Sequence, residues 1–352
     1  MAQKVIFSNE IHTTLRQVLE GMEYNKLFVL IDENTAHYVL PKYAPLFNDL
    51  NAVFITIPAG DVNKNIESLA LVWQQLGNNG ATRKSLLINL GGGMVTDLGG
   101  FAASTFKRGI RFINIPTTLL SAVDAAVGGK TGINFNGLKN EVGVFNEADA
   151  VIISTIPLYT LPIEEVKSGF AEMLKHGLLK DNDTFSKLLR YDFSNFNPDL
   201  LLSLLEESVN VKRDIVAIDP HEKGIRRALN LGHTVGHAFE SLAMSRKQPI
   251  PHGYAVAWGM VVELVLSHMT LGFTSDTLHQ YAQFVLNNYG AFHITCDDYP
   301  ALLSLMQHDK KSRNGEMNFS LLKDVGDIHI DFEADIEDIK NAMDIYRDLM
   351  HI

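Results

Sequence analysis

Short apolar segments rich in β-branched and aromatic residues recur through the first 155 residues. Five of these segments are strand candidates: KLFVLID, AVFITIPAG, SLLINL, RFINIPTT and ADAVIIS. An amphipathic segment from Asn65 to Leu76 and a helix of small residues from about Val95 to Phe106 lie between them. Strands that alternate with helices in this way predict a parallel sheet with βαβ crossovers. Ligands of such sheets bind beyond the carboxyl ends of the strands.

After Pro157 the pattern changes to long segments in which apolar residues recur with the period of a helix. These segments cover residues 163–179, 198–218, 255–269, 275–288 and 336–350. A chain of 352 residues also exceeds one ordinary compact core. We therefore predict an α/β fold in two domains. A Rossmann-like parallel-sheet domain is expected over residues 1–158 and a mainly α-helical domain over residues 159–352.

Charge and cysteine content narrow the classes of protein. Thirty Lys and Arg residues against 41 Asp and Glu residues give a formal charge of −11, which argues against a nucleic-acid partner. The single cysteine, Cys296, cannot form an internal disulfide, and the N-terminus lacks a charged segment followed by an apolar core. The longest apolar runs fall short of the roughly 20 residues of a membrane helix. We therefore expect a cytoplasmic protein without a membrane partner.

A glycine-rich loop follows the third strand candidate. The segment SLLINL runs directly into Gly91-Gly92-Gly93, then Met94 to Asp97 and a helix. Glycines let backbone amides approach a pyrophosphate closely, and a helix N-terminus favours its negative charge. The spacing is not the dinucleotide fingerprint, so a tight strand-to-helix turn explains this loop equally well.

Three histidines and a glutamate favour a metal site in the second domain. In LNLGHTVGHAFE, His233 and His237 stand four residues apart, and His252 follows in PHGYAVAWG. A helix would place the first two, with Glu240, on one face. Catalytic zinc sites use three protein ligands and leave one position open, and Glu172 is the best candidate for a carboxylate ligand. These residues alone do not separate His233 from His237 as a ligand.

Five motifs in fixed order extend this interpretation over residues of about 30 to 320. They are GGGMVTDLGGF, RFINIPTTLLSAVDAAVGGKTG, SGFAEMLKHG, RRALNLGHTVGHAFE and PHGYAVAWGM. Together they resemble the 3-dehydroquinate synthase family of the sugar phosphate cyclases. The resemblance implies a carbon–oxygen lyase of the shikimate pathway, and hence of aromatic amino acid biosynthesis. Its substrate is 3-deoxy-D-arabino-heptulosonate 7-phosphate, and its products are 3-dehydroquinate and phosphate. The implied steps are oxidation by NAD, phosphate elimination, reduction, ring opening and intramolecular aldol closure.

The resemblance also implies roles for individual residues. The implied metal ligands, for zinc or alternatively cobalt, are Glu172, His233 and His252. The implied NAD-binding residues are Asp32, Asn34, Asp61, Lys64, Gly92, Gly93, Met94, Asp97, Thr117, Thr118 and Lys139. The implied substrate residues are Asp124, Lys130, Asn140, Lys175, Lys212, Arg226, Asn230 and His237, with either Lys310 or Lys311. Arg108 resembles a residue that reaches into the site of a neighbouring subunit, which implies a homodimer.

Four positions depart from the family pattern. Asp61 and Tyr254 each stand where Glu is usual, and Ala125 stands where Ser is common. Asp61 keeps a carboxylate that can accept from a ribose hydroxyl. Asn136-Gly137-Leu138 precedes Lys139 where Leu-Gly is typical, so a cation near Asn140 is shifted.

Three other functions remain open. One is another sugar phosphate cyclase whose substrate lacks the carboxylate. The acid substrate is favoured by the joint presence of Asn140, Lys175, Lys212, Arg226, Asn230 and His237, since a carboxylate and a phosphate need charge-assisted donors. A second is a metal-dependent polyol dehydrogenase, which would release NADH and hold no phosphate. A third is a catalytically inactive homologue, for which the loss of a metal ligand is expected.

Overall fold

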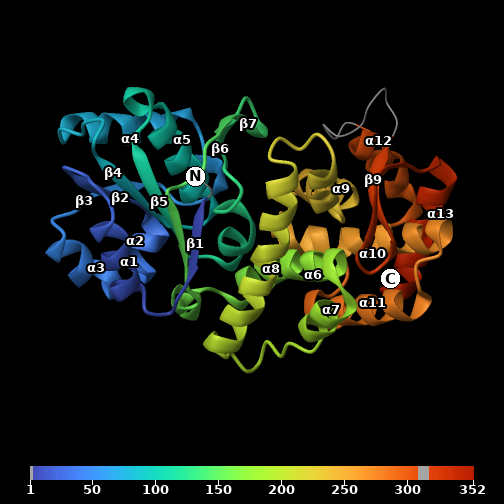
Figure 1. The fold of residues 1–352 in the computed structure, drawn as a ribbon. Helices are drawn as coiled ribbons and strands as arrows, with labels where there is room; N and C mark the ends of the chain where they lie inside the picture. Colours follow the sequence, from blue (N-terminus) through green and yellow to red (C-terminus); the bar gives the residue numbers. More distant parts are fainter. Residues whose placement is uncertain (1–2, 308–316) are drawn as a thin grey trace. The chain divides into compact units, whose positions relative to one another are not determined.

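The computed structural model describes residues 3–307 and 317–352, and the chain divides into two compact units (Figure 1). The first unit comprises Met1–Pro162 and Phe196–Val209, and the second comprises Ile163–Asn195 and Asn210–Ile352. The long helix α8 (Pro198–Ile218) contributes residues to both units. The single domain boundary after residue 158 that the sequence suggests therefore stays a prediction.

A six-stranded parallel sheet forms the centre of the first unit, in the order β1-β8-β5-β4-β2-β3. Its strands are β1 (Lys4–Phe7), β2 (Leu27–Asp32), β3 (Val53–Ile57), β4 (Leu86–Gly91), β5 (Arg111–Pro116) and β8 (Ala150–Ile153). All five strands expected from the sequence are present, and the α/β fold is confirmed. The edge strand β1 was not expected, because its four residues are too short to show a clear pattern.

Helices cover both faces of this sheet (Figure 1). The first crossovers contain α1 (Ile11–Glu20), α2 (Glu33–Tyr38) and α3 (Leu40–Asp49), and the later ones contain α4 (Ile66–Asn78) and α5 (Gly93–Thr105). The chain runs outward through β2 to the edge strand β3, and then returns through β4 to β5. Right-handed crossovers place the helices of these two directions on opposite faces. Strands β2 and β4 are buried at every residue, which explains why their sequences are almost entirely apolar, with Asn89 and Asp32 as the buried polar residues.

A β-hairpin that the sequence interpretation missed follows β5. Strands β6 (Lys130–Phe135) and β7 (Leu138–Phe145) pair antiparallel around Asn136 and Gly137, whose φ angles are 50° and 79°. Two positive φ angles in a two-residue loop define a type I′ turn, for which Asn-Gly is the preferred sequence. The Asn-Gly insertion before Lys139 is therefore the turn of this hairpin.

The second unit is mainly helical, as expected. Its helices are α6 (Ile163–Lys180), α7 (Asn182–Leu189), the second part of α8, α9 (His233–Ser245), α10 (His252–Leu271), α11 (Ser275–Tyr289), α12 (Tyr299–Gln307) and α13 (Ile336–Leu349). The antiparallel hairpin of β9 (Asn318–Asp324) and β10 (Asp327–Glu333) was not expected. Helix α10 packs against α6, α9, α11 and α13 and is buried along most of its length.

Helix α10 corrects one expectation from the sequence. It has 20 residues and is apolar enough to cross a membrane by length and composition, although 72% of its most apolar window is buried inside the structure. The core helix of a globular unit meets the same test, since it too must be apolar on all sides. Its apolar character is explained by its central position among four other helices of the unit.

Candidate active site

The glycine loop joins the end of β4 to the start of α5 in the first unit. Gly92 is the N-cap of α5, and Gly93 is its first residue. A Cβ atom on Gly91 would lie 2.6 Å from the Val95 side chain, so a larger residue would displace the turn. The Thr117 amide donates to the Gly91 carbonyl at 2.9 Å and fixes the end of β5 beside the loop. The first amides of a helix have no intrahelical acceptor, so those of Gly93 and Met94 suit a phosphate.

Several predicted NAD residues lie at the carboxyl edge of this sheet. Asp32 ends β2 and accepts from the Thr35 amide at 2.6 Å, so one of its oxygens caps α2, on which Asn34 is exposed. Lys64 is buried and pairs with Asp97 of α5 at 2.7 Å. Because β5, β4, β2 and β3 are adjacent and parallel, the residues that follow them share one edge. The structure thus brings these candidates together, and their binding of NAD stays a prediction.

The β6–β7 hairpin is joined to the same region by Asn134. Its side-chain amide donates to the carbonyl of Asp61 at 3.1 Å and to its carboxylate at 3.2 Å. The Asn134 side-chain oxygen accepts from the Asn140 amide at 2.9 Å. Lys139 and Asn140 lie on β7 and are exposed, and Asn140 has a left-handed φ of 53°. This hairpin therefore fixes the position of Asp61 through a residue that the sequence interpretation did not select.

The remaining predicted residues of the first unit lie on short segments. Thr118 accepts from the amide of Ser121, the first residue of the π-helical turn Ser121–Ala125, at 3.1 Å, and this turn carries Asp124. Lys130 is the exposed first residue of β6. Arg108 has a left-handed φ of 67° at the end of the short helix Phe106–Arg108. The binding roles of these residues stay predictions.

The second unit brings together the three predicted metal ligands. Glu172 lies on α6, while His233 and His252 are the first residues of α9 and α10. The Nε2 atoms of His233 and His252 lie 3.5 Å and 3.7 Å from the same Glu172 oxygen, Oε1. Glu172 is 1% exposed and pairs through its other oxygen with buried Lys175. Two imidazole nitrogens and one carboxylate oxygen around one point fit a divalent transition metal such as zinc or cobalt.

The carboxylates and basic groups of this cluster shift one another's pKa. Burial by itself would raise the pKa of Glu172, but the neighbouring Lys175 and His252 outweigh burial and hold that pKa well below its usual range. Burial by itself would lower the pKa of His252, but the carboxylates of Glu172 and Glu240 raise it to about 9. Both shifts arise because the carboxylates and the basic groups lie within a few ångströms of one another in a poorly solvated place.

His237 lies beside the cluster rather than within this ligand set. Its ring centroid is 5.3 Å from that of His233 and 5.9 Å from that of His252. The structure also groups His237 with Glu240 and His252 as a second set that could hold an ion. The geometry thus offers two arrangements that share His252, and the one with Glu172 agrees with the expectation from the sequence.

Close contact between α9 and α10 positions the two histidine ligands. A side chain on Gly232 or Gly259 would overlap atoms of the facing helix, so both helices approach through glycine. Glu263 of α10 is fully buried, and its two oxygens accept from the amides of Gly232 at 2.6 Å and Val235 at 3.3 Å. A carboxylate from α10 therefore caps the N-terminus of α9. The sequence interpretation missed Glu263, because only the packing of the two helices reveals its role.

Predicted substrate residues of the second unit include buried cations. Lys212 and Arg226 are only 6% and 3% exposed. The Arg226 guanidinium donates to the Pro220 carbonyl at 2.5 Å. The Asn230 side chain donates to Glu222 at 3.3 Å. Lysine and arginine can offer charge-assisted hydrogen bonds to a carboxylate or phosphate, so these residues suit an anionic substrate. Lys310 and Lys311 lie outside the described residues.

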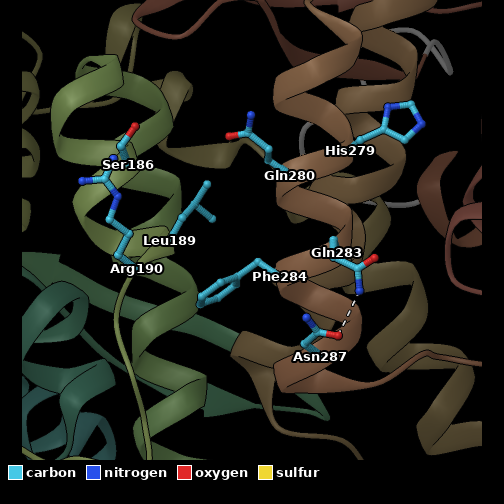
Figure 2. Close-up of a pocket in the computed structure, with 8 residues that line it drawn as sticks. All are labelled: Ser186, Leu189, Arg190, His279, Gln280, Gln283, Phe284 and Asn287. Carbon is cyan, nitrogen blue, oxygen red and sulfur yellow. Dashed lines mark hydrogen bonds between the residues drawn. The ribbon is translucent and has the colours of Figure 1, made fainter.

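A separate groove of about 600 Å³ lies between α7 and α11 in the same unit (Figure 2). Leu189 and Phe284 supply its apolar lining, and Arg190 and His279 are among its polar residues. Gln283 donates to Asn287 on the α11 side at 2.9 Å. The described residues that line this groove include no carboxylate or second histidine, so they form no metal-ligating set.

Comparison with solved structures defines the class of this fold. The chain superposes on 2-epi-5-epi-valiolone synthase from Streptomyces hygroscopicus, solved with NAD⁺ and Zn²⁺, with a TM-score of 0.87, 24% identity, and coverage of 99% of this chain and 97% of that one. It also superposes on 2-deoxy-scyllo-inosose synthase complexed with carbaglucose-6-phosphate, NAD⁺ and Co²⁺, with a TM-score of 0.85, 23% identity, and coverage of 96% and 95%. The chain therefore shares the fold of these two synthases.

Sequence comparison narrows this class to one family. The family model described as 3-dehydroquinate synthase N-terminal matches residues 54–168, and the one described as 3-dehydroquinate synthase C-terminal matches residues 169–312. The 3-dehydroquinate synthase of Parabacteroides distasonis is 49% identical over 346 residues, which cover 98% of each chain. This chain belongs to the 3-dehydroquinate synthase family.

Proposed function

We propose that this chain catalyses the conversion of 3-deoxy-D-arabino-heptulosonate 7-phosphate to 3-dehydroquinate and inorganic phosphate, with NAD and a divalent metal, zinc in the first place. The observation that carries the proposal is the cluster of Glu172, His233 and His252, which lies in a unit with the buried cations Lys212 and Arg226. The 49% identity to the 3-dehydroquinate synthase of Parabacteroides distasonis, which extends over 98% of each chain, supports the same reaction.

The proposed metal ligands are Glu172, His233 and His252. When bound, the metal would supply Lewis acidity to substrate hydroxyls, and NAD would take up and later return a hydride. Lys175 neutralises Glu172 and keeps this buried carboxylate ionised as a ligand. His237, beside the cluster, is suited to hold or move a proton of the substrate.

The anionic groups of the substrate call for cationic partners in this chain. Arg226 offers two parallel N–H donors for a carboxylate or phosphate, and Lys212 offers a compact charge. We propose further substrate contacts for Asp124, Lys130, Asn140, Lys175 and Asn230 on the strength of the motif resemblance.

The cofactor proposal rests on the glycine loop and its neighbours. Gly92, Gly93 and Met94 would hold the pyrophosphate with backbone amides at the N-terminus of α5. Carboxylates such as Asp32 and Asp61 would accept from ribose hydroxyls. Asn34, Lys64, Asp97, Thr117, Thr118 and Lys139 complete the proposed NAD set.

We also propose that the protein works in the cytoplasm as a homodimer in which Arg108 contributes to the site of the other subunit. Each of two variants, Arg108→Ala and Glu172→Gln, should be inactive alone. Mixed after subunit exchange, they should regain activity, because one site of each hybrid dimer carries both wild-type residues. Fully exchanged hybrids without activity would contradict the role of Arg108 across subunits.

The decisive experiment supplies the heptulosonate phosphate in excess over NAD. Phosphate should accumulate over many turnovers while free NADH does not, because the hydride returns to the substrate. Stoichiometric NADH without phosphate would instead identify a polyol dehydrogenase. Turnover of a substrate that lacks the carboxylate, with none of the acid, would identify another sugar phosphate cyclase.

A variant pair tests the buried cations in the same assay. Lys212→Ala removes a charge-assisted hydrogen bond worth about 1.5 to 3 kcal/mol, and should lower kcat/KM by about 10- to 100-fold. Lys187→Ala is the matched control, because Lys187 is an exposed lysine of the same unit paired with Asp183. Equal activity in the two variants would remove Lys212 from the proposed substrate set.

A further inference from the structure

Each of the two histidine ligands has an acceptor beside its Nδ1 atom. The His233 Nδ1 lies 3.1 Å from the Leu231 carbonyl oxygen, and the His252 Nδ1 lies 3.3 Å from a carboxylate oxygen of Glu240. A carbonyl or an ionised carboxylate can only accept, so both rings must carry their hydrogen on Nδ1. In the neutral form of each ring the lone pair is then on Nε2, and both Nε2 atoms face Glu172 Oε1.

Glu240 reaches His252 from the helix that carries the other histidine ligand. It lies seven residues after His233, on the same face of α9, and its side chain is 12% exposed. Helix α9 therefore carries one ligand at its start and, two turns later, the carboxylate that contacts the second ligand. Metal-ligating histidines commonly donate their other ring N–H to such a group, which fixes the tautomer and the ring orientation.

The alternative arrangement gives Glu240 a different role. If His237, Glu240 and His252 held the ion, His252 would turn its Nδ1 lone pair toward it and leave an N–H facing Glu172. The arrangement with Glu172 is favoured because the Leu231 carbonyl sets the tautomer of His233 independently of Glu240. In that arrangement a fully buried carboxylate oxygen and two Nε2 atoms already point to one place.

We propose that Glu240 is a positioning residue of the metal centre, which holds His252 as an Nε2 ligand through a carboxylate–histidine contact and does not itself bind the metal. The inference rests on the proposed function only in requiring a metal at Glu172, His233 and His252. The negative charge of Glu240 makes the His252 ring a stronger donor to the metal, and its position keeps the ring from rotating.

The test measures metal affinity and ligand geometry without substrate or NAD. Zn²⁺ affinity is measured by competition with a chromophoric chelator, and the Co²⁺-loaded protein gives a visible absorption spectrum that reports its ligands. Glu240→Ala should weaken Zn²⁺ binding about 10- to 100-fold and alter the Co²⁺ spectrum. Glu240→Gln should lose less affinity, because its amide oxygen still accepts from Nδ1. His252→Ala supplies the reference for a lost ligand.

Glu337→Gln is the matched control, since Glu337 is an exposed residue of α13 that pairs with Lys340 of the same helix. It should leave metal affinity and spectrum unchanged. If Glu240→Ala keeps the wild-type Zn²⁺ affinity and Co²⁺ spectrum, Glu240 does not position His252. If it loses as much Zn²⁺ affinity as His252→Ala, Glu240 is itself a metal ligand. Either result overturns the proposal.

The same measurements separate this inference from the proposed reaction. A wild-type chain that binds metal but releases no phosphate counts against the reaction alone, because the affinity series is complete without turnover. A wild-type chain that binds neither Zn²⁺ nor Co²⁺ overturns both.

Discussion

The variant Glu263→Gln tests whether the carboxylate that caps α9 stabilises the second unit against unfolding. Glu263 is fully buried on α10 and accepts from the amides of Gly232 at 2.6 Å and Val235 at 3.3 Å. Glutamine has the same size but keeps only one acceptor oxygen. Its NH₂ group must then face one of the two amide donors, so one buried N–H loses its partner.

The expected cost has two parts. A buried donor without an acceptor costs about 1 to 3 kcal/mol, and loss of a negative charge at a helix N-terminus costs about 0.3 to 2 kcal/mol. Because these parts overlap, we expect a loss of about 2 to 4 kcal/mol in the free energy of unfolding. For a unit of this size, that corresponds to a decrease of about 4 to 16 °C in melting temperature.

The assay is thermal unfolding of the metal-free protein, followed by calorimetry so that the transitions of the two units are resolved. The transition of the helical unit should move and that of the parallel-sheet unit should not. Glu337→Gln on the exposed surface of α13 controls for the change of charge. Because His233 follows Gly232 directly, the variant should also bind Zn²⁺ more weakly. A melting temperature equal to that of the wild type would refute the capping role.

Three further substitutions test the effects of burial, close contact and open space. Tyr43 is 3% exposed, its hydroxyl has no partner among the described residues, and burial raises its pKa from 10.0 to about 12. Stability from the neutral phenol is thus present below pH 10 and is lost as pH rises through about 12. Tyr43→Phe should match or exceed wild-type stability by up to about 1 kcal/mol at pH 7 and lose less above pH 10; urea unfolding at both pH values checks this, and a clearly less stable variant contradicts it. Gly253→Ala would overlap the Ser168 carbonyl, so it should cost about 1 to 3 kcal/mol and displace His252, lowering Zn²⁺ affinity. Gly77→Ala, in a helix with open space around it, should instead stabilise by about 0.5 to 1 kcal/mol; equal melting temperatures in the two glycine variants would contradict the reasoning.

The hairpin of β6 and β7 shows that a pattern of apolar residues does not predict an exposed strand. Every residue of β7 is exposed, so its sequence carries no buried alternation to mark it as a strand. The Asn136-Gly137 pair was available as a turn signal, since both residues adopt the positive φ angles that this dipeptide favours.

The metal cluster was predictable in its members but not in its surroundings. Residue types and motif order selected Glu172, His233 and His252, which the structure brings within reach of one ion. Glu240 and Glu263 were not selected for these contacts, because they act on residues 12 and 28 to 31 positions away through the packing of α9 against α10. A glutamate that caps another helix looks no different in sequence from one exposed to solvent.

The sequence by itself determined which face of each long element is buried, and hence the parallel sheet, the helical unit and the position of the glycine loop between β4 and α5. Periodicity conveys this because side chains three or four positions apart in a helix, or two positions apart in a strand, lie on the same face and are buried together. Only the tertiary structure decided which side chains from different elements meet. The glycines at 232 and 259 let α9 and α10 approach closely, and that contact sets the distances among Glu263, the start of α9 and the histidine rings. Such distances depend on how two helices cross, which no spacing along one chain segment specifies.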